Sequence, residues 1–384
     1  MFLPISHFHS KIQKSYVDNV VVAALNSGAT IYALLQIGNI LFLGGNFTSI
    51  GGVSRNGIAA VDATTGTLLP FFNAGGVGGG TPVVMTFHFT GSMLLVGGYF
   101  TSFGGATRNG IAAIDPNTGT LLPWYPTGGV GGPSFFLSSF AQKGNYLYLA
   151  GHFTSIGGIA RTRLAAVDLS NASVLSWYPT GGAISGFPRK IVLGEDGNTL
   201  FLGGSFLNVG GVAKARLVAL DSNTGSVLPF TPPLFSSSSS STPYVDQIIQ
   251  IGSKLFIAGD FNTISSQNRM NFAVVDATTG ALLSDYPPNG GISGYGVYAL
   301  AKKENSILLM GVFTSIAGVS RFGIANLDPA NMQVLSWYPP NGLGNTDVSI
   351  QKASVFGPDT LWISGYFSNI GGLPRNGIAK LNLF

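Results

Sequence analysis

Five polar residues are the best candidates for chemistry in this chain: Asp246, Asp260, Asp347, His152 and Arg189. His152 and Asp260 each stand directly before a Phe that recurs along the chain, at a position where the residue type varies freely. Arg189, Asp246 and Asp347 stand where apolar runs begin. Such side chains can form a polar ligand site if the fold brings them together, and a metal would need several of their oxygens at one point. The alternative is that they are solvated loop residues.

A second candidate set combines arginines with aromatic residues. Each arginine lies eight residues after the recurring Phe, and each Trp-Tyr pair follows sixteen residues after its arginine. If the intervening segment forms a hairpin, each guanidinium stacks on an aromatic face, which is favourable by roughly 0.5–2 kcal/mol. This set either staples neighbouring units or forms a rim that binds sugar or protein. Its members are Arg108, Arg161, Arg321, Trp124, Tyr125, Trp177, Tyr178, Trp337 and Tyr338.

These residues belong to a unit that is repeated seven times at intervals of 52 to 55 residues. The recurring Phe of each unit is Phe47, Phe100, Phe153, Phe206, Phe261, Phe313 or Phe367. A fixed period of this length in short apolar runs is typical of a radial or solenoid array. Each unit reads as four short strands joined by polar, Gly-rich turns, for example 83–89, 94–98, 111–115 and 120–125. We therefore predict an all-β fold, a seven-bladed β-propeller of four-stranded antiparallel blades.

The two ends of the chain complement each other. The seventh unit stops after its third strand, whereas an additional apolar run, Val20–Leu25, precedes the first unit. We expect this N-terminal strand to complete the last blade and close the ring, because closure removes exposed sheet edges. The predicted organisation is a tail over 1–19 and one propeller over 20–384. The Ser-rich stretch 229–243 is expected to be a surface loop.

Composition excludes several classes of function. Only 9% of the residues are charged and the net charge is +4, with no run of Lys or Arg, so we expect no nucleic-acid partner. The chain has no Cys and no apolar run long enough for a membrane helix. We see no signal peptide. Four His and two Glu suggest neither a catalytic triad nor a metal centre, and we expect no cofactor.

The signature GG-x-FTSIGG-x-x-RNGIAA-V/I-D-x-x-TG resembles the delta-60 repeat, a β-propeller family of large surface or secreted proteins. The run LFLGGNFTS (41–49) is similar to the fungal cortical polarity-marker propellers. Both resemblances imply a propeller fold. A looser likeness joins AAVDATTGTLLPFF (59–72) to quinoprotein-type propellers, which implies a quinone-dependent enzyme, although the adjacent cysteines of that group are absent here.

We predict a non-enzymatic binding or structural module that interacts with a protein partner or self-assembles. The scarcity of charge and of catalytic residues favours a place on a cell surface, in a secreted complex or on a virus particle. One alternative is a carbohydrate-binding lectin that uses the rim aromatics. The other is an enzyme, quinoprotein-like or hydrolytic, with its site at the mouth of the central channel that a propeller encloses.

Overall fold

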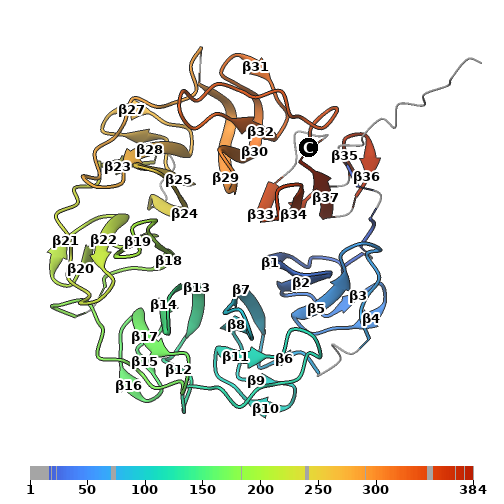
Figure 1. Ribbon diagram of the computed structural model, residues 1–384, viewed down its shortest axis with the longest axis vertical. Coiled ribbons are helices and arrows are strands. Elements are labelled where there is room, and N and C mark those ends of the chain that lie inside the picture. The colour runs from blue at the N-terminus through green and yellow to red at the C-terminus, as the bar shows by residue number, and fades with distance from the viewer. Residues whose placement is uncertain are drawn as a thin grey trace, which may run out of the picture.

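The computed structural model describes residues 17–383 apart from 19, 23, 71–74, 183, 238–241, 290, 344–348, 368 and 376. Within these residues every regular element is a β-strand and all strand pairs are antiparallel, so the predicted all-β class is confirmed. The described part of the chain contains no helix that is long and apolar enough to cross a bilayer. The strands form small sheets that stand around a central axis (Figure 1).

Three strands make up the main sheet of each repeat, and the described residues hold seven such sets. The inner strands are β1 (Ile31–Ile37), β7 (Val83–Phe89), β13 (Phe136–Lys143), β18 (Pro188–Leu193), β24 (Tyr244–Ile251), β29 (Ile292–Lys303) and β33 (Ser349–Phe356). The middle strands are β2 (Ile40–Gly45), β8 (Leu94–Tyr99), β14 (Tyr146–His152), β19 (Thr199–Gly204), β25 (Lys254–Asp260), β30 (Ser306–Ile316) and β34 (Thr360–Tyr366). The third strands are β5 (Ile58–Asp62), β11 (Ile111–Ile114), β17 (Leu164–Asp168), β22 (Leu217–Asp221), β28 (Phe272–Asp276), β32 (Ile324–Leu327) and β37 (Ile378–Asn382).

The predicted fourth strand is reduced to a single bridge in each of the first six repeats. In the second repeat, Ile114 pairs with Leu121, and the Leu122 N–H donates to the Ala113 carbonyl over 2.8 Å. Pro123 follows directly, and because proline lacks an N–H it cannot extend the ladder. The four-stranded blades that we predicted are therefore three-stranded sheets with a short, single-bridge outer segment.

Short hairpins follow the middle strands on the outside of the molecule. They are β3 (Ser49–Ile50) with β4 (Val53–Ser54), β9 (Ser102–Phe103) with β10 (Ala106–Thr107), β15 (Ser155–Ile156) with β16 (Ile159–Ala160), β20 (Asn208–Val209) with β21 (Val212–Ala213), β26 (Thr263–Ile264) with β27 (Gln267–Asn268), and β35 (Asn369–Ile370) with β36 (Leu373–Pro374). In the sixth repeat β31 (Val319–Ser320) pairs with the end of β30. Three linker strands, β6 (Val77–Gly78), β12 (Val130–Gly131) and β23 (Phe235–Ser236), pair with these hairpins. In these three places the linker between repeats therefore lies beside the hairpin.

The hydrophobic core lies between neighbouring sheets. Leu41 and Leu43 of β2 pack in one cluster with Trp362 of β34 and Ile378 of β37. The inner strands contact their neighbours around the circuit, and β33 contacts β1. Gly97 in β8 lets the next sheet approach, because a Cβ atom there would lie 2.6 Å from the Phe140 ring. The first and last repeats are therefore packed together like the others.

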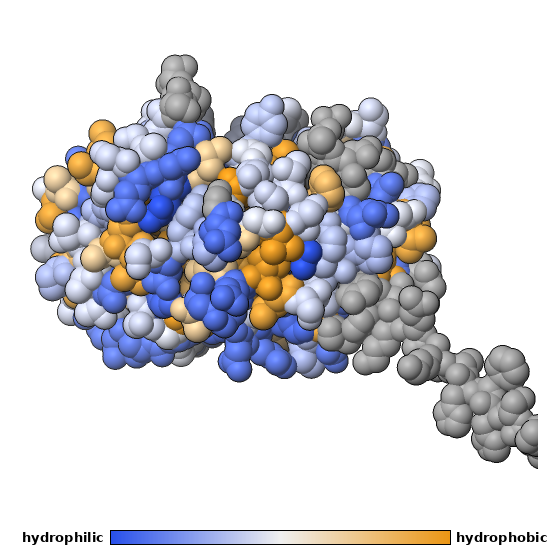
Figure 2. All heavy atoms as spheres, turned by 90° about the horizontal axis from the view of Figure 1, so that it is seen from above, coloured by the Kyte–Doolittle hydropathy of each residue, from blue (hydrophilic) through white to orange (hydrophobic). Residues whose placement is uncertain are grey.

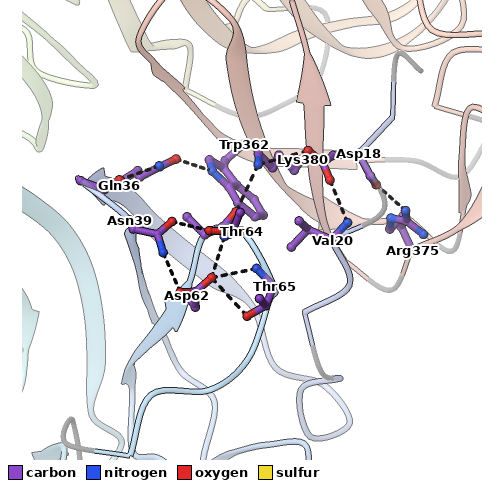
Figure 3. Close-up of polar contacts among 12 residues, drawn as sticks. Asp18, Val20, Gln36, Asn39, Asp62, Thr64, Thr65, Trp362, Arg375 and Lys380 are labelled. Atoms are coloured by element: carbon purple, nitrogen blue, oxygen red, sulfur yellow. Dashed lines mark hydrogen bonds and ion pairs between the residues drawn. The ribbon is translucent and has the colours of Figure 1, made fainter. Parts of the chain in front are cut away.

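The N-terminal segment pairs with the last repeat, but at a different residue from the one predicted. Val17 forms an antiparallel bridge with Leu381, and the Asp18 N–H donates to the Lys380 carbonyl over 3.0 Å. Figure 3 shows Asp18 between Lys380 and Arg375. The Arg375 guanidinium donates to the Asp18 carbonyl over 2.6 Å, and Lys380 pairs with the Asp18 carboxylate at 3.1 Å.

The apolar run Val20–Leu25 has another role. Leu25 bridges Ile50 of the first repeat, while Val20 and Val22 are buried in the cluster that contains Trp362. The run is apolar because it fills the space between the last and first sheets. We had expected this run to pair with the last repeat because it is apolar. The residue that forms the bridge to that repeat is instead Val17, which stands before the run.

Candidate functional site: the channel mouth

Each inner strand contains an irregularity at the same place, where one residue is left without a partner on the middle strand. In β18 the register passes from Pro188 to Lys190, and in β24 it passes from Val245 to Gln247. A bulge of this kind bends the strand and redirects a side chain. We call the unpaired positions the bulge column: Tyr32, Met85, Ser138, Arg189, Asp246, Tyr298 and the position of Gln351.

Five members of the bulge column line one cavity of about 450 Å³: Tyr32, Met85, Ser138, Arg189 and Asp246. These residues come from five different inner strands, which stand around the central axis (Figure 1), so the cavity lies at the centre of the set of sheets; we call it the channel-mouth cavity. Its other lining residues are Phe136, Phe187, Pro188 and Lys352. The size is within the range of about 300–1,000 Å³ that is typical of small-molecule sites.

Two further cavities are less suited to polar recognition. One of about 400 Å³ lies between residues 24–31 and the last sheet, and one of about 570 Å³ lies beside Pro229 and the linker that follows it. Neither is lined by a charged residue. The channel-mouth cavity is the one of the three that combines charges with aromatic rings.

The structure brings together two of the five polar candidates, Arg189 and Asp246. The Arg189 Nη1 atom lies 3.8 Å from the Asp246 Oδ1 atom, and the two side chains are 42% and 33% exposed. The guanidinium also lies over the Tyr244 ring, 3.9 Å from its centre. An exposed pair of this kind adds little stability, so Arg189 and Asp246 remain available to a ligand.

Two lysines at the same mouth were not singled out from the sequence. Lys352 lines the cavity, and Lys190 follows Arg189 in β18. Burial and, to a smaller extent, the positive charge of Lys352 lower the pKa of Lys190 to about 8, whereas Asp246 opposes the shift. Within the described part of the chain neither lysine belongs to an ion pair. The signal that finds them is the bulge column, because each lysine directly follows one of its members.

The remaining three of the five polar candidates are His152, Asp260 and Asp347. His152 lies between two aromatic rings, 5.7 Å from the centre of Phe136 and 4.9 Å from that of Phe187. Asp260 is paired in register with Tyr244 and therefore lies near Arg189. Asp347 lies outside the described residues. Among the described side chains no three His, Asp or Glu residues form a group that could hold a metal ion.

The second candidate set of arginines and aromatic residues, which we call the rim set, joins different segments of the fold. Arg108 lies 4.6 Å from the ring centre of Tyr125, Arg161 lies 5.1 Å from that of Tyr178, and Arg321 lies 4.4 Å from that of Tyr338. A fourth pair of this kind, Arg269 over Tyr286 at 4.6 Å, was not singled out from the sequence. Each tyrosine hydroxyl also accepts a backbone N–H from the residue that follows its arginine.

The tryptophans of the rim set are not open to a ligand. Trp124, Trp177 and Trp337 are only 9%, 4% and 6% exposed. Their indole N–H groups donate to backbone carbonyls of the next repeat, at Asp168, Asp221 and Asn382. The expectation that these indoles offer an exposed stacking face for sugar is therefore corrected: their faces are covered by the next sheet.

Comparison with known proteins identifies the fold. Residues 92–121 match a family model described as a domain of unknown function (DUF5122) beta-propeller. No curated protein matches the chain. The chain is similar to a computationally designed protein, Ika8, with 14% identity and a TM-score of 0.54 over 94% of this chain and 99% of that one.

A second solved structure has the same degree of similarity. It is the extracellular domain of a hybrid two-component system from B. thetaiotaomicron, with 14% identity and a TM-score of 0.53. The match covers 96% of this chain and 40% of that one. At this level of identity the likeness concerns the fold alone. Together with the family match it shows that this chain has a β-propeller fold.

Proposed function

We propose that this protein is a seven-bladed β-propeller, of the delta-60 repeat type, closed by its N-terminal segment, and that it is a non-enzymatic binding module. Closure is supported by one repeated contact. Arg108 and Arg161 each donate to a carbonyl of the fourth segment of their own repeat, at Leu122 and Leu175. Arg375 makes the same contact with the Asp18 carbonyl, so the N-terminal segment takes the fourth place in the last blade.

The observation that carries the binding proposal is the bulge column. The same backbone irregularity recurs in all seven inner strands. The five unpaired residues that line the cavity nevertheless differ in size, polarity and charge: Tyr32, Met85, Ser138, Arg189 and Asp246. A repeated backbone with a varied side chain is what a propeller needs to build an asymmetric site from symmetric parts. The channel-mouth cavity is the resulting ligand site.

The side chains of this cavity favour binding over catalysis. Ser138 is the aliphatic hydroxyl in the lining, and the backbone carbonyls of Ala150 and Pro188 both lie 3.1 Å from its Oγ atom as acceptors. Among the described residues its hydrogen-bond partners are these two carbonyls, so it lacks the histidine partner of a Ser–His pair. One carboxylate, Asp246, lines the cavity, whereas general acid–base pairs of carboxylates require two.

The test is a thermal-shift screen with sugars, carboxylic acids, nucleotides and amino acids as probes. We expect at least one class to raise the melting temperature of the parent and of Lys302→Ala/Glu195→Ala. That pair, 2.6 Å apart and 42% exposed on each side, matches the Arg189–Asp246 pair but lies at the opposite ends of the inner strands. Arg189→Ala/Asp246→Ala should lose the shift. A shift that persists there, or a screen without any stabilising probe, overturns the proposal.

A second candidate function, assembly with further copies of this chain, is favoured by one repeated surface feature. The hairpin turns expose an apolar residue in several repeats: Val53 at 45%, Ile159 at 49%, Val212 at 43% and Val319 at 40%. The edge-on view of Figure 2 shows hydrophobic patches among hydrophilic residues around the rim. Regularly spaced apolar residues of this kind are suited to contacts between copies.

Light scattering at increasing protein concentration tests this second function. The parent should form oligomers, and replacing Val53, Ile159, Val212 and Val319 by Thr should leave a monomer with an unchanged circular dichroism spectrum. A parent that stays monomeric at the highest concentration refutes self-assembly. We further propose that the protein acts on a cell surface, in a secreted complex or on a virus particle, which its scarcity of charge favours and which the extracellular origin of one structural neighbour supports.

A further inference from the structure

We propose that the channel-mouth cavity binds a sugar that carries a carboxylate, such as a hexuronic acid unit of an acidic oligosaccharide. This inference rests on the proposed binding function and names its ligand class. Three features of the described residues carry it: an excess of positive charge, an exposed aromatic face, and an acceptor for hydroxyl groups.

The positive charge calls for an anionic group. Arg189, Lys190 and Lys352 gather at the mouth, whereas Asp246 is the carboxylate that lines the cavity. Neither Lys190 nor Lys352 has a hydrogen-bond or ion-pair partner among the described residues. Two ammonium groups that are partly buried near each other repel, and a carboxylate placed between them would relieve that repulsion. The mutual effect of the lysines on the pKa of Lys190 is consistent with this closeness.

The aromatic face calls for a ligand with an apolar side. The Phe187 ring is 43% exposed, which is unusual for a Phe beside a cavity. The His152 ring lies edge-to-face with it at 4.9 Å, and the Arg163 guanidinium lies over one face of the Phe187 ring, 5.8 Å from its centre. The negative face of an aromatic ring attracts the C–H bonds that one side of a pyranose presents. Phe136 extends this surface on the other side of His152.

Asp246 lets the cavity discriminate between a sugar and a simple anion. Its carboxylate is an acceptor for two or more hydroxyl hydrogen bonds and would repel a small anion that lacks hydroxyls. A neutral sugar, in turn, would leave Lys190 and Lys352 without a counter-charge. A carboxylate-bearing sugar uses all three features at once, because its ring, its hydroxyls and its acid group meet Phe187, Asp246 and the lysines.

Calorimetry with trigalacturonic acid, and with its fully methyl-esterified form as the matched neutral ligand, tests this inference. We expect the acid to bind and the ester to bind at least tenfold more weakly. Lys352→Gln and Phe187→Ala should each weaken binding of the acid at least tenfold. Lys302→Gln removes one positive charge away from the cavity and should leave the affinity within twofold of the parent.

Every other result overturns the inference. Equal binding of acid and ester would mean a neutral-sugar site, and binding of acetate or phosphate as tightly as trigalacturonic acid, unchanged by Phe187→Ala, would mean a site for anions alone. Both leave the proposed binding module standing. Failure to bind either sugar, while another probe class shifts the melting temperature, would likewise refute only the ligand class. Melting curves of each variant establish that it is folded.

Discussion

Two aromatic side chains show how the repeat separates stability from binding. Trp177 is 4% exposed, packs edge-to-face on Tyr148 at 4.9 Å, and donates to the next repeat. Phe187 is 43% exposed at the channel mouth. Both are aromatic, but only the first holds two sheets together.

We therefore expect Trp177→Ala to reduce the free energy of unfolding by about 3–5 kcal/mol, because it empties a buried site and leaves the Asp221 carbonyl without its donor. Phe187→Ala, the matched control, should cost less, about 1 kcal/mol, since this residue is already 43% exposed in the folded protein. Urea unfolding curves measure both. Equal losses in the two variants would contradict the assignment of Trp177 to the interface.

The lowered pKa of Lys190 predicts that the stability of the protein depends on pH. Its pKa falls from 10.5 to about 8 in the folded state, chiefly through burial and then through Lys352. Below pH 8 both states are protonated and the cost of the buried charge is fully present. Between pH 8 and 10.5 the unfolded state binds more protons, so this contribution makes the protein more stable as the pH rises. Asp246 and His88 are the other titratable groups that interact with it.

Lys190→Met should consequently stabilise the protein at pH 7, by an amount of order 1–3 kcal/mol. The gain over the parent should shrink as the pH is raised from 8 to 10, because the parent loses its buried charge there. Melting temperatures of both proteins at pH 7, 8, 9 and 10 give the comparison. A constant difference across this range, or a less stable variant at pH 7, would show that Lys190 is not a buried cation.

At the scale of elements, the turn after each third strand depends on one aspartate. The Asp62 carboxylate accepts the backbone N–H groups of Thr64 and Thr65, both at 2.8 Å (Figure 3). Hydrogen bonds from Thr65 and then Thr64 lower its pKa. Asp276 is held in the same way, with the N–H and hydroxyl of Thr279 as the largest causes of its lowered pKa.

These turns should make the fold labile in acid. Because the folded pKa lies below the unfolded value, the contribution of each carboxylate is present above about pH 4 and is lost as the pH falls through the folded pKa. In Asp276→Asn the side-chain oxygen still accepts N–H groups but no longer titrates. We expect this variant to be less stable than the parent at pH 7 and to lose less between pH 5 and 2.5, as measured by urea midpoints. A parallel decline in both proteins would exclude Asp276 as a source of acid sensitivity.

The strands were largely predictable, whereas the site was not. Alternation of apolar residues and Gly-rich turns predicts β7 and β8 almost residue by residue, since these patterns are local. The bulge in each inner strand has no local signature: Arg189, Ser138 and Tyr32 share neither size nor charge. Lys352 and Lys190 come from separate repeats, and only the convergence of the inner strands brings them to one mouth. Arg189 and Asp246 were named as candidates because both stand at strand starts, but their contact with each other was not predicted.

At the scale of the whole molecule, the channel mouth exists only if the first and last repeats are held together. Contacts that span that junction include the Val17–Leu381 bridge, the Arg375–Asp18 hydrogen bond, and the Trp362 indole that donates to Gln36 over 2.7 Å. The side-chain hydroxyl groups of Tyr366 and Thr30 form a further hydrogen bond of 2.8 Å, just before β1 begins. If this junction opened, Tyr32 and Lys352 would separate and the cavity would lose a wall.

Cysteine cross-linking across the junction tests this arrangement most directly, because the chain contains no natural cysteine. Directly opposed residues of antiparallel strands have Cα atoms about 4.5–5.5 Å apart, within the range of a disulfide. We predict that Val17→Cys with Leu381→Cys forms an intramolecular disulfide on mild oxidation and raises the melting temperature, whereas Val20→Cys with Leu381→Cys keeps both thiols free. If the Val17 pair stayed reduced, or if the Val20 pair were the one to close, the ring would not be joined as described and the channel mouth could not be the ligand site.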